Sequence, residues 1–209
     1  MNAVFITGSH ALAALLVFCS GCVSFERGYP DQHYFVIEVK RNVNPPTTSG
    51  NGVVEVAEVL ISPRYTEKSF VYRTSEARYE SDFYNQFFRP PGAMLTEVAG
   101  RWLNDAGLFQ EVFGSVTQAD ANYFIEGNVI RLYGDFRSSP KAVMEIQFLL
   151  LKYTTDSSYD DNTKIVLGKN YSSEIPIAST AAGDLMQGWN TALGEILNAF
   201  LADLKNNVN

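Results

Sequence analysis

The sequence predicts an α+β fold, in which a mainly antiparallel sheet of about five strands carries two amphipathic helices on one face. Three observations predict it. Segments of strand and helix composition follow one another in the order strands, helix, strands, helix. The strands of the second half are joined by short polar turns, as in antiparallel hairpins. Two amphipathic helices have enough apolar surface to cover one side of a single sheet.

The first half of the chain has four segments of strand composition, at 33–40, 53–62, 70–73 and 77–82. In the second segment, Val54 and Val56 alternate with glutamates, which indicates a strand with one wet face and a bulge near Ala57. The third and fourth segments are short and close together, so they predict a small hairpin.

The two predicted helices are 93–106 and 183–205, where apolar residues recur at spacings of three and four. Pro90 and Pro91 precede the first helix, and proline is tolerated in a first helical turn. Gly107 follows it, where a left-handed glycine often ends a helix. The strands of the second half are predicted at 108–113, 121–136, 141–155 and 164–177.

The chain's two cysteines follow an N-terminal apolar run over 11–18. Eight residues are too few for the roughly 20 of a membrane-spanning helix, but they suit the core of a secretory signal. A metal site would need further Cys or His ligands near Cys19 and Cys22, and the two histidines of the chain are isolated. We therefore interpret the run as part of a signal peptide.

Small residues directly before Cys22 resemble a bacterial lipobox, in which the cysteine after the cut is acylated and becomes the first residue. Val23, rather than Asp, follows Cys22, which in bacterial lipoproteins resembles sorting to the outer membrane. No later segment is long and apolar enough to span a membrane, so attachment would be by lipid. The sequence thus predicts three parts: a lipoprotein signal peptide over 1–21, a lipidated cysteine with its tether over 22–32, and a single domain over 33–209.

The formal net charge of −7 and the pI of about 4.8 argue against nucleic acid as a partner, because phosphate binding needs basic patches. They also argue against tight binding of a polyanionic glycolipid. Candidate catalytic residues are few. His33 is isolated and is expected at the surface, and Glu80 and Asp82 share one face of a strand, where they could form an acid pair or simply face water.

The segment 156–162 gathers three carboxylates that could hold Ca²⁺, but it lacks the glycine and the closing glutamate of an EF-hand loop. A polar hairpin tip is the expected structure there. No nucleophile elbow or phosphate-binding loop is recognisable. The sequence therefore predicts a protein that is not an enzyme and that has no cofactor and no metal site.

Four aromatic residues crowd into the approach to the first helix, and they are Phe83, Tyr84, Phe87 and Phe88. Buried, they would be core around the start of that helix, and we expect this of most of them. Exposed, they would form a patch for a partner or for lipid, because exposed apolar patches of this size seldom lack a role. These four residues are the candidate partner-binding surface.

The run 53–113 resembles the ABC-type transport auxiliary lipoprotein family. The resemblance covers most of the chain after the tether. Its motifs are a strand that ends in Pro, here Ile61–Pro63, and a short "VYR" piece, here Val71–Arg73. An aromatic-rich segment then leads to a helix that begins with Pro, and the helix is followed by "GLF", here Gly107–Phe109. The strand "YFIEGNVIRLYGDF" and its hairpin partner also look like that family.

The resemblance implies a non-enzymatic lipoprotein on the periplasmic side of the outer membrane. Its partners would be an MCE-domain periplasmic protein and the ABC permease complex, which move phospholipid or another hydrophobic substrate between membranes. Two alternatives stay open: a lipoprotein that plugs an outer-membrane β-barrel of the lipopolysaccharide-insertion type, and, more remotely, a periplasmic hydrolase. A sheet covered on one face leaves a face and an edge open, so a homo-oligomer or a docked partner is also expected.

Overall fold

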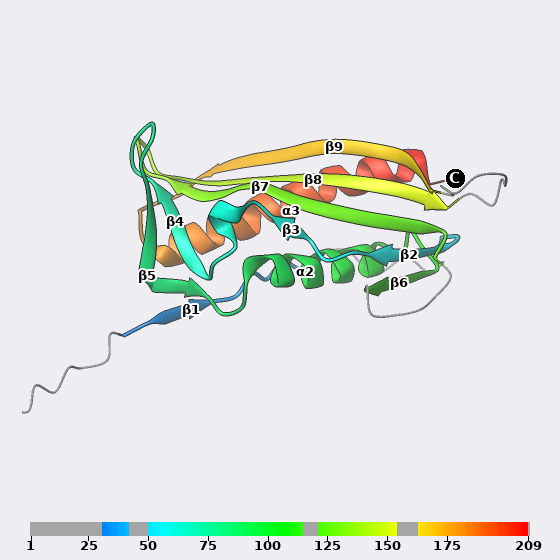
Figure 1. The fold of residues 1–209 in the computed structure, drawn as a ribbon, viewed down its shortest axis with the longest axis horizontal. Helices are drawn as coiled ribbons and strands as arrows, with labels where there is room; N and C mark the ends of the chain where they lie inside the picture. Colours follow the sequence, from blue (N-terminus) through cyan, green and yellow to red (C-terminus); the bar gives the residue numbers. More distant parts are fainter. Residues whose placement is uncertain (1–30, 42–49, 115–120, 154–162, 209) are drawn as a thin grey trace, which may run out of the picture. The chain divides into compact units, whose positions relative to one another are not determined.

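The computed structural model describes residues 31–41, 50–114, 121–153 and 163–208, and residues 32–209 form one compact unit. Strand β7 (Tyr123–Asp135) lies at the centre of a mixed sheet of nine strands (Figure 1). Along one edge β7 pairs in antiparallel fashion with β8 (Lys141–Tyr153), which pairs likewise with β9 (Thr163–Pro176). These three long strands are hairpin neighbours, as the polar turns between them predict.

Three short strands share the other edge of β7, and all of them run parallel to it. They are β2 (Val53–Val56), β3 (Leu60–Ile61) and β4 (Ser69–Arg73), which pair with successive stretches of β7. The sheet is extended beyond them at both ends. Strand β6 (Glu111–Gly114) is parallel to β2, β5 (Tyr79–Phe87) is antiparallel to β4, and β1 (His33–Phe35) is parallel to β5.

Helices α2 (Pro91–Ala106) and α3 (Ala182–Asn207) contact each other and lie on the same side of the sheet (Figure 1). Helix α2 packs near β2 and β6, and α3 packs along β8 and β9. Gly107 ends α2 with a φ of 61°, a left-handed conformation that glycine adopts without strain. A short 3₁₀ helix, η1 (Pro63–Tyr65), follows β3.

The core lies between the helices and the sheet. Strand β8 shows why, because alternate residues along it are buried toward α3: Ala142, Met144, Ile146, Phe148 and Leu150. The ring of Phe148 stacks on that of Phe200 of α3, with 4.3 Å between centroids. Each large apolar side chain removed from water in this way stabilises the fold by roughly 1.5–3 kcal/mol.

The opposite face of β7, β8 and β9 is polar over its middle part. Arg131 Nε lies 2.5 Å from Glu145 Oε2, and the Asn170 amide donates to Glu145 Oε1 at 3.1 Å. Gln147 donates in turn to Asn170 Oδ1 at 3.1 Å. One face of the three strands is therefore core, and the middle of the other face has a network of hydrogen-bonded polar side chains directed away from the helices.

The predicted α+β class with two helices is confirmed, but the prediction of about five antiparallel strands is wrong. The sheet has nine strands and is mixed. The predicted strand 33–40 pairs only over β1, and the chain then crosses the helices with Ile37 buried and with the Glu38 N–H donating to Asn190 Oδ1 at 3.2 Å. The predicted strand 53–62 is broken after β2 and resumes as β3. Strands of two to four residues contain too few side chains to show a period.

Candidate functional site

Five large side chains at the β1–β5 end of the sheet are more than half exposed. We call them the aromatic surface, and they are Tyr34, Val36, Phe83, Tyr84 and Phe88. The ring of Tyr34 meets that of Phe88 edge-on at 6.4 Å, and Phe83 meets Tyr84 edge-on at 5.5 Å. Figure 1 shows β1, β4 and β5 gathered at the end of the sheet opposite the start of β9.

A large bulge in β5 brings Phe83 and Tyr84 to the surface. Ser69 pairs with Gln86 and Val71 pairs with Ser81, so a single residue of β4 faces four residues of β5, 82–85. Such a bulge leaves its extra residues outside the ladder and redirects their side chains. The sequence prediction of a strand over 77–82 is right in type, but it stops where the bulge begins.

The carboxylate of Asp82 holds this bulge together. Its Oδ1 accepts the backbone N–H of Tyr84 at 2.8 Å and that of Asn85 at 3.1 Å. Its Oδ2 accepts the Asn85 side-chain amide at 2.7 Å and the Tyr72 hydroxyl at 2.5 Å. Asp side chains commonly stabilise turns by accepting the N–H two residues on, and here a second strand adds a hydroxyl.

This network shifts two pKa values in opposite directions. Burial by itself would raise the pKa of Asp82, but the hydrogen bonds from Tyr72 and Asn85 outweigh it, so the pKa of Asp82 is lowered from its ordinary 3.8. Burial, and then the hydrogen bond to Asp82, raise the pKa of the Tyr72 hydroxyl well above its usual range. Tyr72 therefore stays a neutral donor, and Asp82 stays a charged acceptor at neutral pH.

Gln32 links β1 to the bulge. Its side-chain amide donates to the Phe83 carbonyl oxygen at 3.2 Å, and its Oε1 accepts the Tyr34 hydroxyl at 2.8 Å. The Gln86 amide donates to the same Phe83 carbonyl at 2.9 Å. The parallel pairing of β1 with residues 85–87 completes the contact. The aromatic surface is therefore built where the chain first joins the sheet.

The structure divides the four aromatic residues that the sequence grouped together. Phe83, Tyr84 and Phe88 are exposed, which makes the expectation of burial for most of the four wrong. Phe87 is only 2% exposed and belongs to the core instead of the candidate surface, because its ring packs against Phe70 at 4.7 Å and Trp189 at 5.4 Å. Tyr34 and Val36 join the surface without a sequence signal, because only the pairing of β1 with β5 brings them there.

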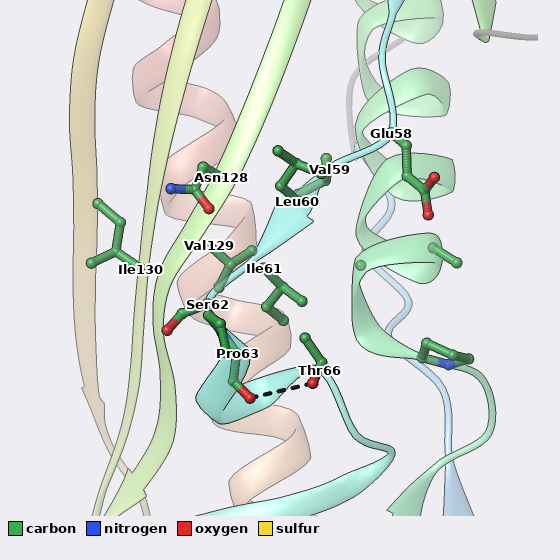
Figure 2. A pocket seen from close by; sticks show the side chains of 13 residues that line it. Glu58, Val59, Leu60, Ile61, Ser62, Pro63, Thr66, Asn128, Val129 and Ile130 are labelled. Atoms are coloured by element: carbon green, nitrogen blue, oxygen red, sulfur yellow. Dashed lines mark hydrogen bonds between the residues drawn. The ribbon is translucent and has the colours of Figure 1, made fainter.

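A second feature is an open groove of about 700 Å³ beside β3 (Figure 2). Most of its lining is apolar, and it comes from β3, η1, β7 and the start of α2: Val59, Leu60, Ile61, Pro63, Pro90, Ala93, Val129 and Ile130. Leu60 lies beside Asn128 of β7 and is 68% exposed. This groove was not predicted from the sequence. The only available signal was the apolar run Val59–Ile61, because in a strand with one wet face two neighbouring residues cannot both face the core.

Between the groove and the core, the start of α2 packs closely against the backbone at Val59, directly before β3. A Cβ on Gly92 would lie 2.8 Å from the carbonyl oxygen of Val59, so no larger residue fits there. The Thr96 hydroxyl accepts the Val59 N–H at 2.8 Å and donates to the Gly92 carbonyl at 2.8 Å. The groove can receive an apolar group by shape, and Glu58 is the one ionisable residue of its lining.

The residues that the sequence suggested as candidates for catalysis or metal binding do not form a common site among the described residues. Glu80 accepts from the Thr74 hydroxyl and pairs with Arg78, whereas Asp82 turns to Tyr72, so the two carboxylates are not an acid pair. His33 is exposed at the start of β1, in line with its expected place. Cys22 and the whole segment 156–162 lie outside the described residues.

The described residues contain neither a metal-binding cluster nor a membrane-spanning helix. Within 31–41, 50–114, 121–153 and 163–208, no three His, Cys, Asp or Glu side chains gather as a metal site would require. Of the helices in these same ranges, none has the length and hydropathy needed to cross a membrane.

Comparisons with known proteins identify the fold. No family model and no curated protein matches the chain. Among solved structures, protein XCC0632 from Xanthomonas campestris, described with the family-model DUF330, is 17% identical and aligns over 81% of this chain and 92% of its own with a TM-score of 0.66. An uncharacterized protein is 14% identical over 81% of this chain and 99% of its own, with a TM-score of 0.59.

A third solved structure is the hypothetical protein CT253 from Chlamydia trachomatis, with 9% identity over 76% of this chain and 98% of its own and a TM-score of 0.52. Identities this low carry no information about activity, but the alignments extend over nearly the whole of each compared protein. The chain therefore shares the overall fold of these three proteins.

Proposed function

We propose that the chain is a non-catalytic, lipid-anchored subunit on the periplasmic side of the outer membrane. In this proposal it serves an MCE/ABC-type transport system that moves phospholipid or another hydrophobic substrate between membranes. The observation that carries the proposal is the aromatic surface, which lies where the chain joins the sheet, ten residues after the lipobox-like Ser20–Cys22. The resemblance of 53–113 to auxiliary lipoproteins supports the class of transport system.

The sites on the domain suit binding rather than catalysis. The aromatic surface and the groove at Leu60 both expose apolar side chains. Such exposed patches usually mark contacts with proteins, membranes or ligands. Energy for transport would come from the ATPase of the permease complex, which this chain would only connect to the membrane.

An open sheet edge supports the role of a subunit. Within the described chain, β9 pairs with β8 alone, and it runs for 14 residues. An edge strand of this length offers a row of backbone donors and acceptors to another chain. A partner protein or a second copy of this chain would satisfy these groups, so we propose that the protein acts in an assembly.

The first test of the proposal is the intact mass of protein extracted from membranes. We expect the wild type to begin at Cys22 and to carry acyl groups, and we expect Cys22→Ser to lose both the acyl mass and the membrane fraction. Cys19→Ser is the matched control, because it removes the other cysteine and should leave acylation unchanged. A wild-type chain without acyl groups would overturn the anchor and the proposal with it.

The second measurement identifies the partner. Acylated protein extracted in mild detergent is expected to co-purify with an MCE-domain protein, recognised by peptide mass spectrometry, whereas Cys22→Ser protein is expected to lose it. An acylated chain that instead retains an outer-membrane β-barrel would contradict the transport assignment and favour the alternative of a barrel-associated lipoprotein.

A further inference from the structure

We propose that the aromatic surface, formed by Tyr34, Val36, Phe83, Tyr84 and Phe88, lies against the lipid surface to which Cys22 anchors the chain. This inference rests on the proposed function, because it requires the acylated cysteine. In addition to the proposed function, the β1–β5 end of the domain then faces the membrane, and the opposite end stays available to other molecules.

The length of the tether supports this placement. From Cys22 to Gln32 there are ten residues, which reach at most about 35 Å when fully extended. Gln32 donates to the Phe83 carbonyl at 3.2 Å and accepts from the Tyr34 hydroxyl at 2.8 Å. The tether therefore ends beside the aromatic surface, so the start of this surface stays within about 35 Å of Cys22 in any orientation of the domain.

The residue types suit the boundary between lipid headgroups and acyl chains. Aromatic rings are enriched at this level of a bilayer, where Tyr keeps its hydroxyl in the wet layer while its ring leaves water. Phe83 and Phe88 are 56% and 59% exposed, and each would bury its ring on contact with lipid. Contact with a protein partner would also bury these rings, but the tether keeps this surface close to the membrane.

The charges near the surface are consistent with this contact. The chain is acidic overall, with a formal charge of −7, so general attraction to anionic lipid is not expected. Arg89 nevertheless directly follows Phe88 of the aromatic surface. The Lys68 carbonyl accepts the N–H of the neighbouring Phe87 at 2.6 Å, which brings a second basic residue close in the backbone. Arg89 Nη1 lies 3.7 Å from Glu97 Oε2, and both side chains are more than half exposed. Basic groups beside apolar rings fit phosphate headgroups.

The contact would set orientation and would add little to attachment. Several acyl chains on one cysteine already give stable anchoring, and the short tether keeps the surface at a high local concentration near the bilayer. A test of membrane binding alone would therefore miss the effect. The experiment has to measure how close the aromatic surface lies to the acyl chains.

The test uses the full-length acylated protein in vesicles of phosphatidylethanolamine and phosphatidylglycerol, with or without bromine on the acyl chains. Phe83→Trp reports on the aromatic surface. Ile165→Trp is the matched control, since Ile165 is 59% exposed near the start of β9, at the far end of the sheet (Figure 1). The natural Trp102 and Trp189 are buried, and the wild type gives their background. Tyr84→Trp is a second reporter, in case Phe83→Trp folds poorly.

We expect brominated lipid to quench the added fluorescence of Phe83→Trp by about twofold or more and to leave Ile165→Trp near the wild-type background. Equal quenching of the two variants in acylated protein would overturn this inference and leave the proposed function standing. An unquenched Phe83→Trp whose emission shifts to the blue as the protein-to-lipid ratio rises would mean contact with a second copy, which also overturns it. A chain without acyl groups would overturn both proposals.

Discussion

Phe83 and Phe87 are the same residue type, four positions apart in β5, yet one is at the surface and the other is in the core. Phe87 is 2% exposed and contacts the rings of Phe70 and Trp189. Phe83 is 56% exposed and contacts only the ring of Tyr84 among the ring pairs of the described residues. Composition and hydrophobicity therefore do not account for the difference between them.

The backbone accounts for it. In a regular strand, side chains four residues apart point to the same face of the sheet, so both phenylalanines would face the core. The bulge places four residues of β5, 82–85, opposite one of β4, and this odd number of extra residues reverses the alternation. Asp82 holds that reversal in place. This end of the sheet therefore exposes aromatic rings because the bulge in β5 turns their side chains away from the core.

The largest effect is expected where the ring is buried. Phe87→Ala should lower the free energy of unfolding by about 3–5 kcal/mol, because it leaves a cavity beside Phe70 and Trp189. Urea unfolding followed by circular dichroism measures it. Phe83→Ala is the matched control and should change the same quantity by less than about 0.5 kcal/mol. Equal losses in the two variants would show that the two rings have similar surroundings.

The long elements of the fold could be predicted from the sequence, and the short ones could not. Both helices and the strands β7, β8 and β9 are within two residues of their predicted bounds. Their length shows a period, and short turns set their antiparallel pairing. The parallel pairing of β2, β3 and β4 with β7 depends on contacts between distant parts of the chain, and two to five residues carry no signal for it.

An intermediate effect is expected at the residue that holds the bulge. Asp82→Ala should lower the free energy of unfolding by about 1–3 kcal/mol, because the Tyr72 hydroxyl and two backbone N–H groups lose their acceptor. Amide exchange should also rise at Tyr84 and Asn85. An unchanged stability with unchanged exchange would mean that other contacts hold the bulge.

The dependence on pH separates the charge of Asp82 from its shape. The pKa of Asp82 is lower in the folded chain than its ordinary 3.8, so its stabilising effect is complete above that value and is lost as the pH falls through the folded pKa. The stability gap between the wild type and Asp82→Asn should therefore stay constant above about pH 5 and shrink as the pH falls below about 4. Asp135 and Asp203, whose pKa values are also lowered, are present in both proteins and cancel in the difference.

The candidate site was only partly predictable, for the same physical reason. The sequence located three of its five residues, since Phe83, Tyr84 and Phe88 are close together in the chain. It assigned Phe87 to the same surface, because alternation cannot be read through a bulge whose length is unknown. Tyr34 lies in β1, a strand of three residues whose pairing with β5 spans about fifty positions of sequence, and Val36 directly follows that strand. The role of Asp82 follows from contacts with Tyr72 of another strand.

The smallest effect is expected at the aromatic surface itself. Phe83→Ser combined with Phe88→Ser should change the free energy of unfolding by no more than about 0.5 kcal/mol, because both rings already face water in the isolated domain. Urea unfolding of the full chain in detergent measures it, with Phe87→Ser as the disruptive counterpart. A loss well above 1 kcal/mol would place these rings among the contacts that hold the fold, and their exposure would then say nothing about function. A neutral result leaves binding as the property that large exposed rings of this kind usually serve.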